Sequence, residues 1–186
     1  YNLVYTGNQD RGSQSFSGVN NYDKSVPIPA SREANTDVLR VTVANGGESA
    51  WYWYYYGAVG RSSVTNGDNF RTVVSRRNLY PNWAATSLVP SPNESEDAVF
   101  IPWANQLHKL TYNGSTVDRT LHSYTFSEAT RSFGYSKINR NLWYVGLASG
   151  KFMYSTDGGN SFTASSYSGS WPRQDNSHRK RRQVIA

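Results

Sequence analysis

One turn-forming segment constrains the fold more than any other part of this chain. Residues 155–162 read Ser-Thr-Asp-Gly-Gly-Asn-Ser-Phe. Serine and aspartate side chains bond the backbone of their own turn, and glycine accepts backbone angles that other residues avoid. We therefore expect Ser155, Asp157, Gly159 and Phe162 to form a folded hairpin tip whose ring caps a core, a structural role rather than a chemical one.

This pattern resembles the Asp-box (BNR) signature, which occurs in the blades of β-propellers such as xyloglucanases, sialidases and sortilin-type receptor domains. The resemblance implies propeller blades, and it implies that the turn lies away from any active centre. It narrows the fold far more than the activity, because one fold serves many functions. The Ile-Pro pair at residues 28–29 lacks the arginine of the corresponding sialidase element, so a sialidase is disfavoured.

The segment recurs at a regular distance along the chain. Residues 63–70 keep the serine, the glycine and the phenylalanine but have Thr65 where the aspartate would stand. Phe70 and Phe162 lie 92 residues apart, twice 46, and a propeller blade of four strands takes about 40–50 residues. A third unit is then expected midway, where residues 110–115 read Leu-Thr-Tyr-Asn-Gly-Ser after an apolar strand at 98–103.

The rest of the chain favours an all-β protein. Aromatic residues make up 15% of the sequence, and we find no apolar stripe of helical period. Residues 39–43 alternate apolar and polar, Asn45 and Gly46 fit a hairpin turn, and residues 50–56 return as a strand that is aromatic on both faces. Both faces of this strand must then be covered by other parts of the protein. We predict β-propeller blades of four-stranded antiparallel sheets, with a β-sandwich or jelly roll as the alternative.

The repeat period also predicts the domain organisation. Residues 1–172 correspond to about four blades, and residues 173–186 form a basic linker that leads into a further strand. Four blades is the low end of the known range, so we expect other blades or chains to complete the ring. Much of the net charge of +6 lies in this linker, at residues 179–182, and it indicates a solvated loop rather than a nucleic-acid surface.

The loop at residues 7–13, Gly-Asn-Gln-Asp-Arg-Gly-Ser, holds the best candidate for a catalytic group. Glycines let the backbone bring Asp10 to the mouth of a ring of blades. The loop resembles Gly-x-Gln-Asp-x-Gly loops of bacterial Asp-box propellers and, more faintly, loops that carry a catalytic aspartate in xyloglucanases. The resemblance implies a glycoside hydrolase, which needs a second carboxylate that the sequence does not identify. The alternative is that Asp10 only caps its own turn.

Aromatic rings are the other candidates. Trp51, Trp53, Trp83 and Trp103 are interpreted as carbohydrate-binding residues that stack on sugar faces, and packing between blades is the alternative for each.

Metal chemistry finds little support in the sequence. The three histidines have no ligand spacing and cysteine is absent, so we expect no metal site and no cofactor. Glu94, Glu96 and Asp97 precede a strand and are interpreted as a solvated turn rather than an acid pair.

Two functions remain open at this stage. The favoured one is a propeller module for glycan or protein recognition, with an adhesive or structural role at a cell or virion surface. The alternative is a glycoside hydrolase of the xyloglucanase type that acts on a polysaccharide. We expect an extracellular protein with a polysaccharide, glycan or surface protein as partner, no nucleic acid and no membrane span.

Overall fold

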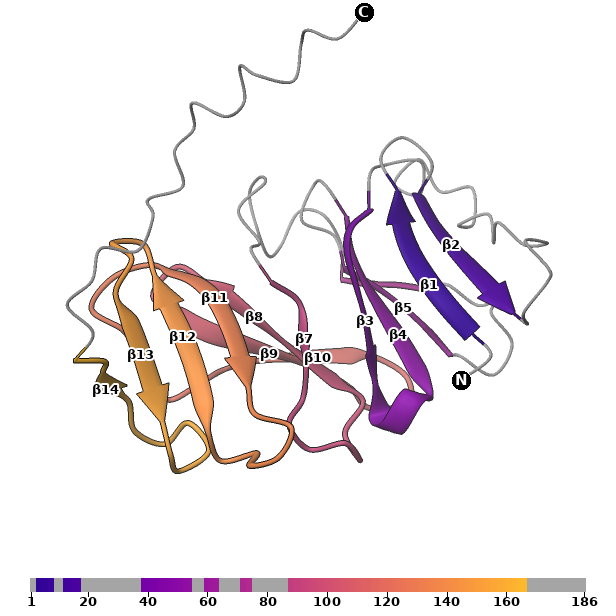
Figure 1. Cartoon of the computed structure of the whole chain (residues 1–186). Coiled ribbons are helices and arrows are strands. Elements are labelled where there is room, and N and C mark those ends of the chain that lie inside the picture. Colours follow the sequence, from indigo (N-terminus) through magenta and orange to yellow (C-terminus); the bar gives the residue numbers. More distant parts are fainter. Residues whose placement is uncertain are drawn as a thin grey trace, which may run out of the picture.

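The computed structural model of the chain describes residues 3–8, 12–17, 38–54, 59–63, 71–74 and 87–166. Within these residues the chain forms β-strands and one short 3-10 turn, η1 (Asn45–Gly47). The strands make four antiparallel sheets that stand side by side (Figure 1). The segments at 18–37 and 167–186, with the basic linker among them, and most of the degenerate repeat at 63–70 lie outside the described residues.

The strands follow one another in simple order within each sheet. The first sheet pairs β1 (Leu3–Asn8) with β2 (Gly12–Ser17). The second contains β3 (Val38–Ala44), β4 (Ser49–Tyr54), β5 (Val59–Ser63) and β6 (Arg71–Val74). The third contains β7 (Val89–Pro90), β8 (Ala98–Trp103), β9 (Gln106–Tyr112) and β10 (Val117–Leu121). The fourth contains β11 (Thr130–Tyr135), β12 (Trp143–Leu147), β13 (Phe152–Ser155) and β14 (Thr163–Ala164).

Each four-stranded sheet is therefore an up-and-down meander, and neighbouring sheets touch along their strands. β3 lies against β1 and β7, and β8 lies against β11. This stacking of antiparallel four-stranded sheets is the arrangement of propeller blades. The predicted fold class is confirmed, and the alternative of two stacked sheets is not what forms.

The predicted hairpins form where turn residues allow them. Asn45 and Gly46 adopt positive φ angles of 52° and 61° between β3 and β4, conformations that asparagine and glycine tolerate best. The apolar segment at 98–103 is β8, and Asn113 begins the turn between β9 and β10 by accepting hydrogen bonds at Oδ1 from the backbone N–H groups of Ser115 and Thr116. Local turn chemistry thus determines where the strands reverse.

The core lies between the sheets, and β8 contributes to it from both of its faces. Val99 and Ile101 belong to a buried cluster shared with Trp51 and Trp53 of the second sheet. Phe100 belongs to a second cluster, which the third sheet shares with the fourth. The other members of this cluster are Leu107, Phe126, Phe133, Trp143, Val145, Leu147 and Phe162. Alternate side chains of one strand point to opposite faces, so one apolar strand supplies both clusters.

Polar contacts between neighbouring sheets join residues about one repeat apart. Trp51 of the second sheet bonds Asp97, 46 positions later. Ser87, just before the third sheet, accepts from the backbone N–H of Phe133 in the fourth, again 46 positions later. The second sheet is thus bonded to the third, and the third to the fourth. Among the described residues, no helix is long and apolar enough to cross a membrane.

Ile101→Ala tests whether the cluster between the second and third sheets holds the fold. Ile101 has no exposed surface, and truncation of a fully buried isoleucine should lower the free energy of unfolding by about 2–5 kcal/mol. The matched control is Ile138→Ala, because the side chain of Ile138 is 100% exposed and its truncation should change stability by less than about 0.5 kcal/mol. Urea unfolding monitored by tryptophan fluorescence measures both, and equal effects would contradict this description of the core.

Candidate functional site

The candidate residues from the sequence are divided among three environments. Asp10 and Trp83 lie outside the described residues. Trp51 and Trp53 are buried in the cluster between the second and third sheets, so neither ring has an open face and stacking on a sugar is not their role in this structure. Trp103, at the end of β8, packs against the same cluster but keeps part of its surface exposed.

The turn at residues 156–162 joins β13 to β14 and is held by the side chains of its own residues. The Ser155 hydroxyl accepts hydrogen bonds from the backbone N–H groups of Asp157 (3.2 Å) and Gly159 (2.8 Å), and it donates to Asp157 Oδ1 at 2.7 Å. Asp157 in turn accepts from the backbone N–H of Ser161 at 3.0 Å and from its hydroxyl at 2.6 Å. Gly158 and Gly159 take positive φ angles of 73° and 92°. The turn is thus held by hydrogen bonds among its own residues.

These hydrogen bonds also determine the charge state of the aspartate. Donation by the Ser161 hydroxyl and backbone N–H, and by the Ser155 hydroxyl, lowers the pKa of Asp157 to about 2. The carboxylate is therefore ionised at any ordinary pH and all its donors come from its own turn. A group held in this way acts in structure rather than in proton transfer.

The same turn locks the third sheet to the fourth. A Cβ added at Gly159 would stand 2.5 Å from the Trp143 ring and 3.0 Å from His122 Nε2, so only glycine fits there. The ring of His122, which follows β10, lies 5.5 Å from that of Trp143. Phe162 is buried and packs 4.9 Å from Phe126. Of the turn residues that the sequence singled out, Gly159 and Phe162 therefore reach this inter-sheet contact.

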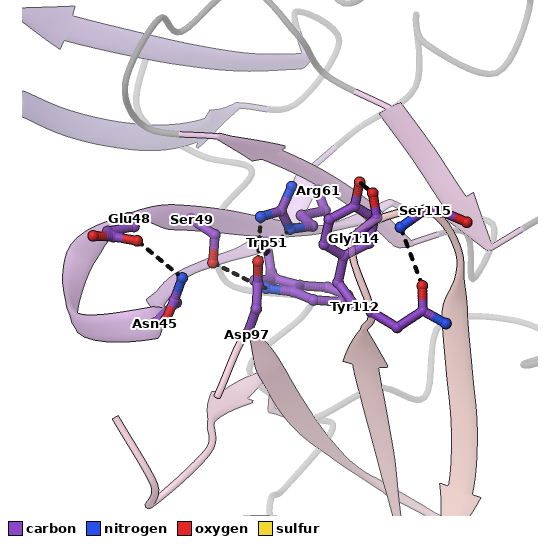
Figure 2. Close-up of polar contacts among 10 residues, drawn as sticks. Asn45, Glu48, Ser49, Trp51, Arg61, Asp97, Tyr112, Gly114 and Ser115 are labelled. Carbon is purple, nitrogen blue, oxygen red and sulfur yellow. Dashed lines mark hydrogen bonds and ion pairs between the residues drawn. The ribbon is translucent and has the colours of Figure 1, made fainter. Parts of the chain in front are cut away.

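A second polar site, not predicted from the sequence, lies between the second and third sheets (Figure 2). Asp97 precedes β8, and its Oδ1 accepts from the Ser49 hydroxyl at 2.7 Å and from Trp51 Nε1 at 2.9 Å. Its Oδ2 accepts from Arg61 Nε at 2.7 Å and pairs with a second nitrogen of the same guanidinium. The two charged side chains are only 15% and 11% exposed. The expectation of a solvated turn is therefore wrong for Asp97.

Aromatic packing completes this charged contact. The Arg61 guanidinium carbon lies 3.9 Å from the centre of the Tyr112 ring, and the Tyr112 hydroxyl donates to the carbonyl of Gly114 at 2.6 Å. A planar guanidinium suits both a carboxylate fork and an aromatic face. The partners are 36 residues apart in the chain, and no local pattern marks such a pair.

A looser set of contacts joins the third sheet to the fourth at their turns. Arg140 donates to the Pro92 carbonyl at 2.8 Å and pairs with Glu94, at side-chain exposures of 43% and 68%. Within the third sheet, Glu96 accepts from the Ser91 hydroxyl at 2.7 Å and pairs with Lys109 at 2.7 Å. Partial burial acts to raise the pKa of Glu96, but these donors outweigh it and the pKa is lowered. Both carboxylates are occupied by neighbours within the chain.

The two described histidines lie in apolar surroundings. Burial, and then the charge of Arg119, lower the pKa of His108 from 6.5 to about 4. Burial, and then the charge of Lys109, also lower the pKa of His122, whose Nδ1 accepts from the backbone N–H of Tyr124 at 3.3 Å. Both rings are neutral at pH 7. Within the described part of the chain, no group of three or more His, Cys, Asp or Glu side chains is arranged to hold a metal ion.

Comparison with known proteins identifies the fold. No protein family and no curated protein matches the sequence. Among solved structures, the GH74 enzyme of Niastella koreensis matches 88% of this chain with a TM-score of 0.56 and 19% identity, and this chain covers 22% of that enzyme. YCF48 bound to a D1 peptide matches 83% of the chain with a TM-score of 0.43 and 15% identity, and 61% of that protein is covered.

The likeness to the first of these proteins establishes the class of fold. That enzyme is a β-propeller, and the described sheets of this chain are β-propeller blades. The chain spans about a fifth of the length of the GH74 enzyme. At 19% identity the comparison shows the class of fold and does not show a function.

Asp97→Ala tests the buried charged contact. Removal of the carboxylate leaves the Arg61 guanidinium mostly buried without its partner and should lower the free energy of unfolding by about 2–4 kcal/mol. The control is Glu94→Ala, which removes the partner of the exposed Arg140 and should change stability by less than about 1 kcal/mol. Chemical unfolding measures the free energy of unfolding of both variants. If Asp97→Ala lowers it no more than Glu94→Ala does, Asp97 has no structural role.

His108 should make the protein less stable in mild acid. The unfolded chain takes up a proton at His108 near pH 6.5, whereas the folded chain does so only near pH 4. Because the unfolded state then binds more protons, the free energy of unfolding falls as the pH drops through this window. We expect His108→Gln to flatten the fall between pH 6.5 and about 4.5, leaving the part due to His122. Unfolding curves at several pH values measure the slope, and an unchanged slope would show that His108 is not responsible.

Proposed function

We propose that this chain is an Asp-box β-propeller module whose function is to recognise a glycan or a protein. The Asp-box assignment is supported by the hydrogen bonds of Ser155 and Asp157 within one turn and by the close approach of Gly159 to Trp143. The module presents its loops to a partner, while its blades provide a rigid support.

One observation carries the preference for recognition over catalysis. Each carboxylate in the described part of the chain accepts a hydrogen bond, or forms an ion pair, with another residue of the chain. These carboxylates are Glu48, Glu94, Glu96, Asp97, Asp118, Glu128 and Asp157. A general acid or base must exchange a proton with its substrate, and groups tied in this way serve the blades instead.

The proposed partners follow from the same module. A polysaccharide, a glycan or a surface protein is the proposed ligand, and the proposed setting is outside the cell, on a cell or virion surface. Trp103 is the described tryptophan that keeps part of its surface exposed, and it is the proposed sugar-stacking residue in this part of the chain. Trp83 remains a candidate outside the described residues.

The alternative proposal is a glycoside hydrolase that acts on a polysaccharide, with Asp10 as one of its two acids. β1 and β2 form an antiparallel hairpin in which Asn8 pairs with Gly12, and Asp10 lies in the segment that connects them. The sequence does not identify the second acid, so this proposal depends on Asp10 and on a partner that remains to be found.

Binding and hydrolysis can be measured on the same samples. The purified chain is titrated by calorimetry with xyloglucan and other soluble polysaccharides, screened on a glycan array, and assayed for release of reducing ends. We expect binding without hydrolysis, and we expect Trp103→Ala to weaken the binding by about tenfold, as loss of a stacking ring does. Leu121→Ala, at an exposed apolar residue of β10, is the control.

Hydrolysis that disappears in Asp10→Asn, with binding retained, would replace the recognition proposal by the enzyme. Failure to bind any glycan would remove glycans from the proposed ligands and leave a protein partner to be tested by surface plasmon resonance against candidate surface proteins.

A further inference from the structure

The segment that follows β10 connects the third sheet to the fourth and lies wholly within the described residues. Residues 122–126, which we call the bridging segment, are bonded to the third sheet at both ends. The backbone N–H of His122 donates to the Leu107 carbonyl at 2.8 Å, and that of Phe126 donates to the Asn105 carbonyl at 2.8 Å. The bridging segment is therefore fixed to β9 and to the turn between β8 and β9.

The rings of the bridging segment rest on the fourth sheet. The centre of the His122 ring lies 5.5 Å from that of Trp143 in β12 and 6.4 Å from that of Phe162. The Phe162 ring also lies 4.8 Å from Tyr124 and 4.9 Å from Phe126. Because Phe162 ends the turn between β13 and β14, these ring contacts hold that turn against the third sheet.

His122 is the group at this contact that takes up a proton in mild acid. Its Nδ1 accepts from the backbone N–H of Tyr124 at 3.3 Å, so the neutral ring carries its proton on Nε2. A Cβ added at Gly159 would stand 3.0 Å from this Nε2. The contact therefore fits a neutral imidazole on one side and a glycine on the other.

The groups around His122 do not favour a charged ring. Burial, and then the charge of Lys109 in β9, lower the pKa of His122, and Lys109 is itself paired with Glu96 at 2.7 Å. The Asp157 carboxylate of the turn is occupied by the serines of its own turn, and the Tyr124 hydroxyl donates to the Phe162 carbonyl at 3.4 Å. From the fourth sheet, two uncharged aromatic rings face the imidazole.

A proton added to His122 changes this contact in two ways. Nδ1 becomes a donor and faces the N–H of Tyr124, so their hydrogen bond is lost. The ring also gains a positive charge in partly buried surroundings beside Lys109, which costs free energy. We propose that protonation of His122 releases the bridging segment from the turn at 156–162, as a pH-sensitive device built into the joint between the third and fourth sheets.

The two sheets themselves stay together in the released form. Phe100 of β8 lies 5.3 Å from Phe133 of β11, and it shares a buried cluster with Val145 and Leu147. None of these contacts involves a group that titrates in mild acid. The inference concerns a conformational change within the chain and does not depend on the ligand proposed above.

The direction of the change follows from proton linkage. The pKa of the released ring is near its ordinary value of 6.5, whereas burial and Lys109 hold the pKa of the packed ring below that value. The released form therefore binds more protons in mild acid, and its population rises as the pH falls. Between pH 7 and pH 5 its ratio to the packed form should rise several-fold, with a limit of about twenty-fivefold set by the ordinary pKa.

NMR spectroscopy of the full chain between pH 7 and pH 5 tests the proposal. We expect the nuclear Overhauser effects between the ring protons of His122 and those of Trp143 and Phe162 to weaken as the imidazole is protonated. Hydrogen exchange of the Tyr124 N–H, corrected for the intrinsic effect of pH, should become several-fold faster. Exchange within β8 and β12 should not change, which distinguishes local release from unfolding of the whole chain.

His122→Asn removes the titrating group but keeps a side-chain acceptor near the position of Nδ1, and it should keep the contact closed at pH 5. His122→Lys, which is charged at pH 7, should show the released form already at that pH. The matched control is His108→Gln, which removes the other described histidine and should leave the acid-induced release in place. The NMR spectrum itself shows whether each variant is folded, and the titration of the unmodified chain stands without them.

Four outcomes would overturn the proposal. They are ring contacts that persist once His122 is protonated, an imidazole that stays neutral until the whole chain unfolds, release that survives in His122→Asn, and release that disappears in His108→Gln.

Discussion

The burial of β8 on both faces is the constraint on which the rest of the structure depends. An antiparallel strand that is apolar on both sides cannot lie at a surface, because each exposed face would leave its side chains in water. Val99 and Ile101 require the second sheet, and Phe100 requires the fourth. A stack of at least three sheets follows from this one strand, and the stack is what makes the chain a set of propeller blades.

Polar groups at the turns select which sheets meet and in which register. The apolar clusters are tolerant of small shifts, whereas Asp97 has its donors in place only when Ser49, Trp51 and Arg61 arrive together. The turn at Ser155 and Asp157 does the same for the fourth sheet, since a side chain at Gly159 would collide with His122, which follows β10 of the third sheet. Specificity of packing thus comes from directional contacts at the ends of the strands, and most of the driving force comes from the buried faces between them.

Local signals were readable from the sequence, and contacts between distant residues were not. The hairpin at Asn45 and Gly46, the strand at 98–103 and the turn at 155–162 each depend on the backbone preferences of a few neighbouring residues. The burial of Trp51 and the pairing of Asp97 with Arg61 depend on which sheets become neighbours, and alternation along one strand does not contain that information. The sequence therefore indicated the turn at 155–162 and gave no sign of the buried ion pair between Arg61 and Asp97.

A blade held through an apolar face depends on its neighbour for stability. The fourth sheet buries Trp143, Val145 and Leu147 against the third, and separation of the two sheets would return these side chains to water. Because the stability of each repeat includes the interface with the next, the fourth sheet depends on the third, just as the third depends on the second through Val99 and Ile101. A partner that binds only the folded sheets therefore stabilises all of them together, in proportion to the logarithm of its concentration.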